Sequence, residues 1–367
     1  MTVRQSQPSP GQAGQASQAS QASQVVGLLD VEDPRTGRGG DSRLPSPRTL
    51  YNQWERQPWA IAQVDVSRDR PQWEAMRPFA RRELLTSLNE LEVGEVFVSR
   101  TLSTLVGYAP SDADRLFLST QVADEARHAQ FFLDYMHEAV GLDETASESD
   151  NTGEESVYSR LFEPKLRASL DSVAASGGDL THWHTAVVEY HLVTEGILAA
   201  AALHLTRQIA RRFELPALEE GLGNVIRDES RHFTFGLAAT RRAVEGTLRD
   251  HIIDVYLAGV DASARILINP HRLADTPVLK AALSQRAALL TAQWDLTKQR
   301  AVRQLRLMGL PELRDETEKV WDRGQAAALA EYAQIWGAPH PVAAVSCARH
   351  PAARTHLIRT LRAAESH

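Results

Sequence analysis

Two short stretches decide the fold: Asp124-Glu125-Ala126-Arg127-His128 and Asp228-Glu229-Ser230-Arg231-His232. Both read Asp-Glu-x-Arg-His. A Glu and a His three positions apart lie on the same face of a helix, so one carboxylate and one imidazole can reach the same metal ion. The Glu-x-x-His spacing alone is a weak signal, but the repeated flanking Asp and Arg argue against coincidence. The sequence therefore predicts two helices that each carry a metal-binding pair.

Apolar residues surround both motifs at helical spacing. They are Leu118, Val122, Phe132 and Met136 around the first motif, and Val225, Ile226 and Phe233 around the second. The ionisable groups of both motifs are therefore expected to face inward. An inward carboxylate must be paired, protonated or bound to a metal ion, because burying a bare charge is very costly.

Two further helical segments each offer one inward carboxylate. Glu95 fills the gap in an apolar stripe that advances by alternate steps of four and three, made of Leu84, Leu88, Leu91, Val98, Leu102 and Leu105. Glu92 falls beside that stripe, so we expect it to be solvated or at the rim and prefer Glu95 as a ligand. Glu195 lies on a second apolar face, formed by Val188, Leu192, Leu198, Ala199 and Ala202.

Four segments thus offer four carboxylates and two imidazoles, namely Glu95, Glu125, His128, Glu195, Glu229 and His232. This is the ligand set of a di-iron or di-manganese carboxylate bundle, and it suits two hard or borderline cations. The alternative is a metal-free bundle with buried Glu-His and Glu-Arg pairs. Asp124 and Asp228 are expected either to hold the His of the opposite motif by a hydrogen bond, or to cap a helix or pair with Arg127 or Arg231.

Composition restricts the partners and the compartment. The 367 residues carry 40 Lys and Arg against 47 Asp and Glu, a net charge of -7, so no basic surplus exists for nucleic acid. The single cysteine, Cys347, excludes an intrachain disulfide and fits a reducing cytoplasm. We find no apolar run of membrane-spanning length and no export signal, so we expect a cytoplasmic protein without a membrane span.

The chain divides into three predicted parts. Residues 1–48, with repeated Gln-Ala-Ser, are expected to form a disordered low-complexity tail. Residues 49–248 are expected to form an all-α, ferritin-like bundle, interrupted by turns at 107–111, 141–155 and 176–179 and with a helix start near Pro216. The acidic turn 141–155 is predicted to be solvated rather than a cation site. Residues 249–367 are expected to add helices that pack on the bundle.

The chain resembles the ferritin-like superfamily that includes ribonucleotide reductase small subunits, multicomponent monooxygenases and the ligand-binding oxidases similar to reductase small subunits. The oxidases match best, over roughly Trp54 to Val244, in the segments Trp59–Ser67, Gly94-Glu95, Gln121–Phe132, Tyr190–Gly196 and Asp228–Gly236. The resemblance implies a Mn/Fe or Fe/Fe pair that activates O2 and an electron donor. It also implies a pocket for a long-chain fatty acid or another apolar molecule, and it allows a homodimer.

Two more residues enter through this resemblance alone. Val98 and Tyr190 match the valine and tyrosine that become joined by an ether cross-link in the oxidases. Helix geometry would place both simply in the core, because Tyr190 lies about 140° from Glu195 on a straight helix and only a bulge would bring it close. Leu203 is a departure, since the oxidases have a tyrosine at this position.

Related activities are weighed at single residues. A reductase small subunit commonly has a radical tyrosine where this chain has Phe132, and the C-terminus lacks an evident apolar acidic docking tail. Arylamine N-oxygenases use an extra His where this chain has Val225. Multicomponent monooxygenase hydroxylases are generally longer, and ferritin-type iron-binding chains are about half this length. We assign no ligand role to other histidines near the third helix and expect them to be polar or surface residues, namely His182, His184, His191 and His204.

Overall fold

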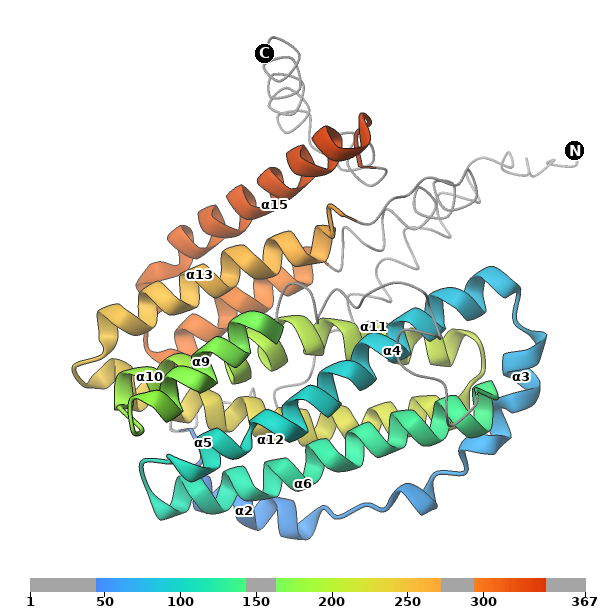
Figure 1. Cartoon of the computed structure of the whole chain (residues 1–367), viewed down its shortest axis with the longest axis horizontal. Helices are drawn as coiled ribbons and strands as arrows, with labels where there is room; N and C mark the ends of the chain where they lie inside the picture. The colour runs from blue at the N-terminus through green and yellow to red at the C-terminus, as the bar shows by residue number, and fades with distance from the viewer. Residues whose placement is uncertain (1–43, 143–162, 272–293, 341–367) are drawn as a thin grey trace, which may run out of the picture. The chain divides into compact units, whose positions relative to one another are not determined.

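The structure is a computed structural model that describes residues 44–142, 163–271 and 294–340. Every regular element in these ranges is a helix (Figure 1). The predicted tail up to residue 43, most of the acidic turn and the last 27 residues (341–367) lie outside the described residues. The first described helix, α2 (Pro47–Arg56), begins two residues before the predicted start of the bundle at residue 49.

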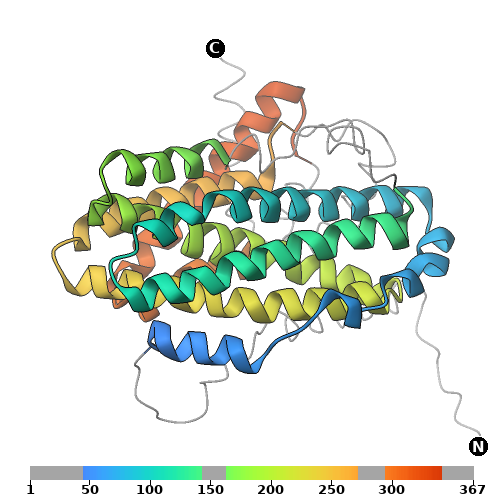
Figure 2. The same ribbon diagram turned by 60° about the horizontal axis from the view of Figure 1, so that its bottom comes forward.

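Four long helical segments form the bundle. They are α4 (Pro78–Thr101), α6 (Asp112–Asp134), a continuous segment made of α10 (Leu180–Val187), η4 (Val188–Ala199) and α11 (Ala200–Arg212), and α12 (Pro216–Glu245). Helix α4 packs against α6 and α11, and α12 packs against α6, η4 and α11, so the four segments close a ring. Figure 2 shows α4, α6 and α12 running alongside one another. The predicted all-α, ferritin-like bundle is confirmed.

Local sequence explains where these helices begin. The Ser111 hydroxyl accepts a hydrogen bond from the backbone N–H of Asp114 (3.2 Å), which caps α6. Pro78 and Pro216 stand at the first position of α4 and α12, where a missing N–H costs nothing. The α12 start is also capped from a distant segment, because the Asp69 carboxylate accepts from the N–H groups of Ala217 and Leu218 (3.0 and 2.9 Å).

The remaining helices connect or cover the bundle. Before α4 lie η1 (Ile61–Gln63), η2 (Val66–Asp69) and α3 (Arg70–Ala75). Between the bundle helices lie α5 (Ser103–Gly107), η3 (Tyr135–Val140) and α9 (Glu163–Ala175). After α12 come α13 (Arg249–Ile268), a helix at 294–308, η5 (Pro311–Leu313) and α15 (Arg314–Trp336). The turns at 107–111 and 176–179 fall between helices as predicted.

The chain forms two compact units. The larger comprises Arg43–Asn269 and Thr297–Gln325, so α13 and the helix at 294–308 contribute to the same unit as the bundle. In this unit α13 packs against η4, and its Tyr256 hydroxyl donates to the Ala301 carbonyl oxygen (2.7 Å). The described part of the smaller unit includes residues 326–340, where Trp336 donates to the Pro270 carbonyl oxygen (2.9 Å).

Two of the apolar clusters in the larger unit lie on either side of a polar layer. One cluster contains Leu88 of α4, Phe131 of α6, Leu203 of α11 and Leu222 of α12. The other contains residues about three to four turns away on the same segments, namely Val98, Phe117, Tyr190 and Phe235. The six predicted ligands lie between these clusters on every segment. The fold therefore surrounds them with apolar side chains on both sides.

The expectation that the chain has no apolar run of membrane-spanning length is wrong. The continuous segment Leu180–Arg212 is long and apolar enough to span a bilayer, with a mean hydropathy of 1.4 over an 18-residue window. However, 78% of that window is buried inside the protein, because this segment is one of the four that form the bundle. Its apolar character therefore fits packing in the protein core.

Candidate metal centre

The structure brings all six predicted ligands together. One group consists of Glu95, Glu125, His128 and Glu229, and in it one potential ligand atom from each residue lies within 4.8 Å of all the others. A second group, which meets the same distance limit, consists of Glu125, Glu195, Glu229 and His232. Glu125 and Glu229 belong to both groups. Two cations held in these groups would therefore be neighbours that share two carboxylates.

Both imidazoles point the same nitrogen into the centre. The Nδ1 atom of His128 lies 3.3 Å from carboxylate oxygens of Glu125 and Glu229 and 3.5 Å from one of Glu95. The Nδ1 atom of His232 lies 3.2 Å from Glu125 Oε1. Neither Nδ1 atom makes a hydrogen bond, although both are fully buried. A buried nitrogen without a hydrogen-bond partner is a nitrogen suited to a metal ion.

The opposite nitrogens are held by the motif aspartates. His128 Nε2 lies 3.3 Å from Asp228 Oδ2, and His232 Nε2 lies 3.2 Å from Asp124 Oδ2. Each aspartate thus binds the His of the other motif, which confirms that prediction. An Nε2–H that donates to a carboxylate leaves the lone pair on Nδ1, as metal binding requires.

The alternative role predicted for these aspartates is present as well. Arg231 donates from Nη2 to Asp124 Oδ2 (3.0 Å) and to Asp228 Oδ1 (2.6 Å), and Arg127 donates to Asp124 Oδ1 (2.9 Å). Two indole N–H groups also donate to these aspartates, from Trp54 to Asp124 (2.9 Å) and from Trp59 to Asp228 (2.7 Å). These donors stabilise two buried, ionised aspartates beside the histidines.

Burial and mutual repulsion control the acid-base behaviour of the centre. Burial is the largest influence on Glu95 and Glu195 and raises the pKa of both carboxyls well above the usual range. Burial acts on Glu125 too, but His232 and His128 outweigh it and hold its pKa well below the usual range. Burial alone would lower the pKa of each histidine. Nearby carboxylates, above all Glu95 for His128 and Glu125 for His232, nevertheless raise the pKa of both histidines well above the usual value.

The donor set fits two divalent cations. Four carboxylates converge within a few ångströms, and the Oε2 atoms of Glu195 and Glu229 are buried without a hydrogen-bond partner. Such oxygens are costly to bury unless a cation binds them. Carboxylate oxygens together with imidazole nitrogens suit iron and manganese. Within the described residues, no Lys or Arg side chain makes an ion pair with any of the four glutamates, so protein cations do not take this role.

One expectation about α4 is wrong. Glu92 was expected to be solvated or at the rim, but it is only 3% exposed, and the Glu95 side chain is 11% exposed. The apolar stripe of α4 therefore does not separate the two residues by burial. Position separates them instead, because Glu95 joins the cluster around His128 and Glu92 does not.

Tyr190 reaches the centre because its segment is not a regular α-helix. Residues Val188–Ala199 form the π-helix η4, in which backbone hydrogen bonds join residues five apart. The bulge required to bring Tyr190 near Glu195 is thus present. The Tyr190 hydroxyl donates to Glu125 Oε1 (2.8 Å).

Val98 lies near Tyr190. Together with four other side chains they line a narrow gap that has no room for a water molecule, the others being Thr101, Leu102, Leu105 and Leu170. Leu203, where the oxidases have a tyrosine, is packed in the apolar cluster that contains Leu88.

Two important residues were missed by the sequence reasoning. Gln121 is fully buried, and its Nε2 lies within hydrogen-bond distance of Glu195 (2.9 Å), Tyr190 (3.1 Å) and Glu125 (3.2 Å). Its position four residues before Glu125, on the same face of α6, was the signal that could have identified it. His191 was expected to be polar or at the surface, but it is fully buried and contacts Gln121 (3.0 Å). His184 is buried as well.

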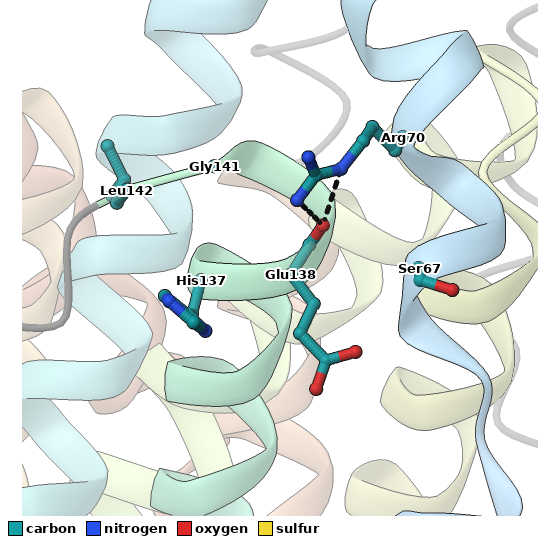
Figure 3. A pocket seen from close by; sticks show the side chains of 6 residues that line it. All are labelled: Ser67, Arg70, His137, Glu138, Gly141 and Leu142. Atoms are coloured by element: carbon teal, nitrogen blue, oxygen red, sulfur yellow. Dashed lines mark hydrogen bonds between the residues drawn. The ribbon is translucent and has the colours of Figure 1, made fainter.

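A separate pocket lies at the end of η3 (Figure 3). Its volume is about 410 Å³, and it is lined by Ser67, Arg70, His137, Glu138, Gly141 and Leu142. The Arg70 guanidinium donates twice to the Glu138 carbonyl oxygen, at 2.9 and 2.6 Å. None of the six predicted ligands lines this pocket, so it does not belong to the candidate metal centre.

Solved structures with a similar fold are R2-like ligand-binding oxidases. The enzyme from Sulfolobus acidocaldarius is 22% identical, with a TM-score of 0.54 over 74% of this chain and 96% of that chain. Two oxidase variants with a reconstituted Mn/Fe cofactor are each 20% identical. One has a TM-score of 0.54 over 76% of this chain and 92% of that chain, and the other 0.55 over 76% and 91%.

The family comparison covers the bundle and all six predicted ligands. The family model described as ribonucleotide reductase, small chain, matches residues 43–254, which is more than half of the chain. The matched region starts just before α2 and ends within α13, so it contains every segment that contributes to the centre. The chain therefore belongs to the ribonucleotide reductase small-chain family.

Proposed function

We propose that the chain is a dimetal-carboxylate oxidase. It binds two metal ions, as a Mn/Fe or Fe/Fe pair, and uses O2 to oxidise an apolar, fatty-acid-like ligand or its own pair of residues Val98 and Tyr190. The observation that carries this proposal is the convergence of six ligand side chains with two inward Nδ1 atoms that have no hydrogen-bond partner. The similar fold of oxidases that hold a Mn/Fe cofactor supports it.

The metals and the protein would divide the chemistry. A bound iron or manganese pair supplies the binding of O2 and the one-electron steps for which side chains are unsuited. Asp124 and Asp228 keep the Nε2 proton on each histidine, so that Nδ1 stays available as a ligand. The apolar clusters on both sides keep water away from the reacting groups.

The internal oxidation would join Val98 to Tyr190. Formation of a bond between the Val98 β-carbon and the Tyr190 oxygen breaks one C–H and one O–H bond and removes two electrons and two protons. A reduced metal pair held by the six ligands would supply the other two electrons, and solvent two protons, so that one O2 would be reduced to two waters. Glu125 Oε1 accepts a hydrogen bond from the phenol at 2.8 Å and is therefore placed to receive its proton. The dry space beside both residues favours this reaction over attack by water.

The remaining assignments concern the partners and the location of the protein. An external electron donor would reduce the metals before each reaction with O2. The acidic net charge of -7 argues against nucleic acid as a partner. The single cysteine fits a location in the cytoplasm. A homodimer is compatible with the family.

A second candidate is a ribonucleotide reductase small subunit, because the chain belongs to that family. The residue at issue is Phe132, four positions after His128, where a radical tyrosine would be expected. Phe132 is fully buried in the apolar cluster beside the centre and has no hydroxyl to oxidise. We therefore expect no tyrosyl radical in the electron paramagnetic resonance spectrum after exposure to O2, and no ribonucleotide reduction with a large subunit.

Peptide mass spectrometry tests the proposed oxidation. The full chain is loaded with iron and manganese, exposed to air and digested. We expect one species that contains both Val98 and Tyr190 and lacks two hydrogens, and we expect it to be absent from metal-free protein and from Tyr190→Phe. Separate, unmodified peptides from fully metallated protein would reject the internal reaction and leave the apolar ligand as the substrate. Reconstituted ribonucleotide reduction would instead establish the second candidate.

A further inference from the structure

The Gln121 side chain makes four polar contacts, all of them buried. Its amide nitrogen faces Glu195 Oε1 (2.9 Å), Tyr190 Oη (3.1 Å) and Glu125 Oε1 (3.2 Å), and its amide oxygen faces His191 Nε2 (3.0 Å). Two of the three groups that face the amide nitrogen are carboxylate oxygens, which accept hydrogen bonds when ionised. The NH2 end of the amide must therefore point toward the carboxylates, and the C=O end toward His191.

This orientation determines the tautomer of His191. A carbonyl oxygen can only accept, so His191 must donate and its proton must lie on Nε2. The Nδ1 atom is then left with a lone pair, and in the structure it is buried without a hydrogen-bond partner. Burial, reinforced by the positive charge of His232, lowers the pKa of His191 to about 3 against the opposing effects of the Val187 carbonyl and Glu125, so the ring is neutral near pH 7.

The contacts form one directional chain of hydrogen bonds. His191 donates to Gln121, Gln121 donates to the Tyr190 oxygen, and the Tyr190 hydroxyl donates to Glu125. Because Gln121 occupies a lone pair of the phenol oxygen, the hydroxyl proton is directed at Glu125. The same amide also donates to Glu195, which places one donor between two of the proposed ligands.

A glycine makes room for His191. A Cβ added at Gly236 of α12 would lie 2.2 Å from the His191 Cβ and 2.9 Å from its Cγ, so no side chain fits there without displacing the histidine. Gly236 lies four residues after His232, on the same face of α12. Gly223, on the same helix, offers a contrast. A Cβ there would meet only the flexible end of Arg207, at 3.2 Å.

We propose that Gln121, held by His191, is a positioning residue that fixes the Glu125 and Glu195 carboxylates and directs the Tyr190 hydroxyl toward Glu125. The proposal rests on the proposed function, because it assigns Glu125 and Glu195 as ligands and Tyr190 as a reacting group. Partners that orient metal ligands typically change metal affinity or activity by about 10- to 100-fold when they are removed.

The first test needs neither metal nor activity. Nitrogen NMR of the metal-free full chain, labelled at histidine, reports which ring nitrogen of His191 carries the proton, and the signal is identified by its loss in His191→Gln. We expect a neutral ring protonated at Nε2 between about pH 6 and pH 8. A proton on Nδ1 would overturn the proposed direction of the chain of hydrogen bonds, whether or not the protein binds metal.

The second test measures metal affinity and the yield of the Val98–Tyr190 species. We expect Gln121→Leu, His191→Leu and Gly236→Ala to weaken metal binding about 10- to 100-fold or to reduce that yield equally. His191→Gln, which can still donate to Gln121, should recover most of the loss, and Gly223→Ala should match the unaltered chain. Values for Gln121→Leu and His191→Leu equal to the unaltered chain would overturn the proposal. Absence of metal from the unaltered chain would reject the proposed function instead, and the NMR result would then decide this inference.

Discussion

Glu92 and Glu95 form a matched pair on α4, since both are glutamates largely shielded from solvent and only one joins the metal-ligand cluster. Glu95→Gln keeps the shape of the side chain but removes a charged ligand from the group around His128. We expect its metal content to fall from about two to about one per chain. Glu92→Gln should retain about two, as measured by elemental analysis. Equal losses in both variants would mean that the wrong carboxylate was assigned.

Protons compete with metals for this centre. In the metal-free chain the pKa values of His128, His232, Glu95 and Glu195 are all raised, so each group keeps its proton to a higher pH than the free side chain does. A metal ion must displace those protons, so its apparent affinity should fall as the pH is lowered and rise as the pH is raised. Calorimetric titrations in buffers of different ionisation heat should show release of roughly one proton or more per metal at pH 7. Metal binding without proton release would contradict this account.

The start of α12 depends on a side chain from η2. Asp69 is fully buried and accepts from two backbone N–H groups of α12 and from the Tyr135 hydroxyl (3.1 Å). Asp69→Ala leaves these donors without a partner, and we expect it to lower the free energy of unfolding by about 2 kcal/mol or more. Urea denaturation measures the loss. Within the described ranges, the side chain of the nearby exposed Asp65 accepts only from Ser67 (2.7 Å), so Asp65→Ala should change little. An equal effect of the two variants would argue against this cap.

Local sequence predicted the helices well, because their ends carry short-range signals. Ser111, Pro216 and the glycines at 177 and 178 stop or start helices through their own backbone preferences. The π-helix η4 has no comparable signal. Its extra residue per turn is stabilised by packing against α12 and α13, which are distant in sequence. For this reason the geometry of a regular α-helix predicts, wrongly, that Tyr190 lies away from Glu195.

Contacts between distant segments explain what else the sequence could not reveal. The repeated motif predicted two alternative roles for the aspartates, and the structure shows both the contact with the opposite histidine and the pairing with arginine. Trp54 and Trp59 donate to those aspartates from more than 60 residues away, and His191 meets Gln121 across 70 residues. Periodicity on one helix predicts which face is inward, but not which inward groups from different helices will meet.

The larger unit places its ionisable centre between two apolar clusters, and this arrangement is favourable only with cations bound. Four carboxylates and two histidines in such a layer would otherwise have to hold protons in place of metals. The central claim therefore concerns the whole chain: one protein molecule holds two metal ions, through the six residues assigned from sequence.

Metal analysis of the full chain tests this claim most directly. The protein is purified aerobically with iron and manganese available, and its metal content is measured against protein concentration, together with Glu125→Ala and His232→Ala. We expect about two iron or manganese ions per unaltered chain and a clear loss of metal in both variants. A chain that carries zinc alone, or no metal, would contradict the account.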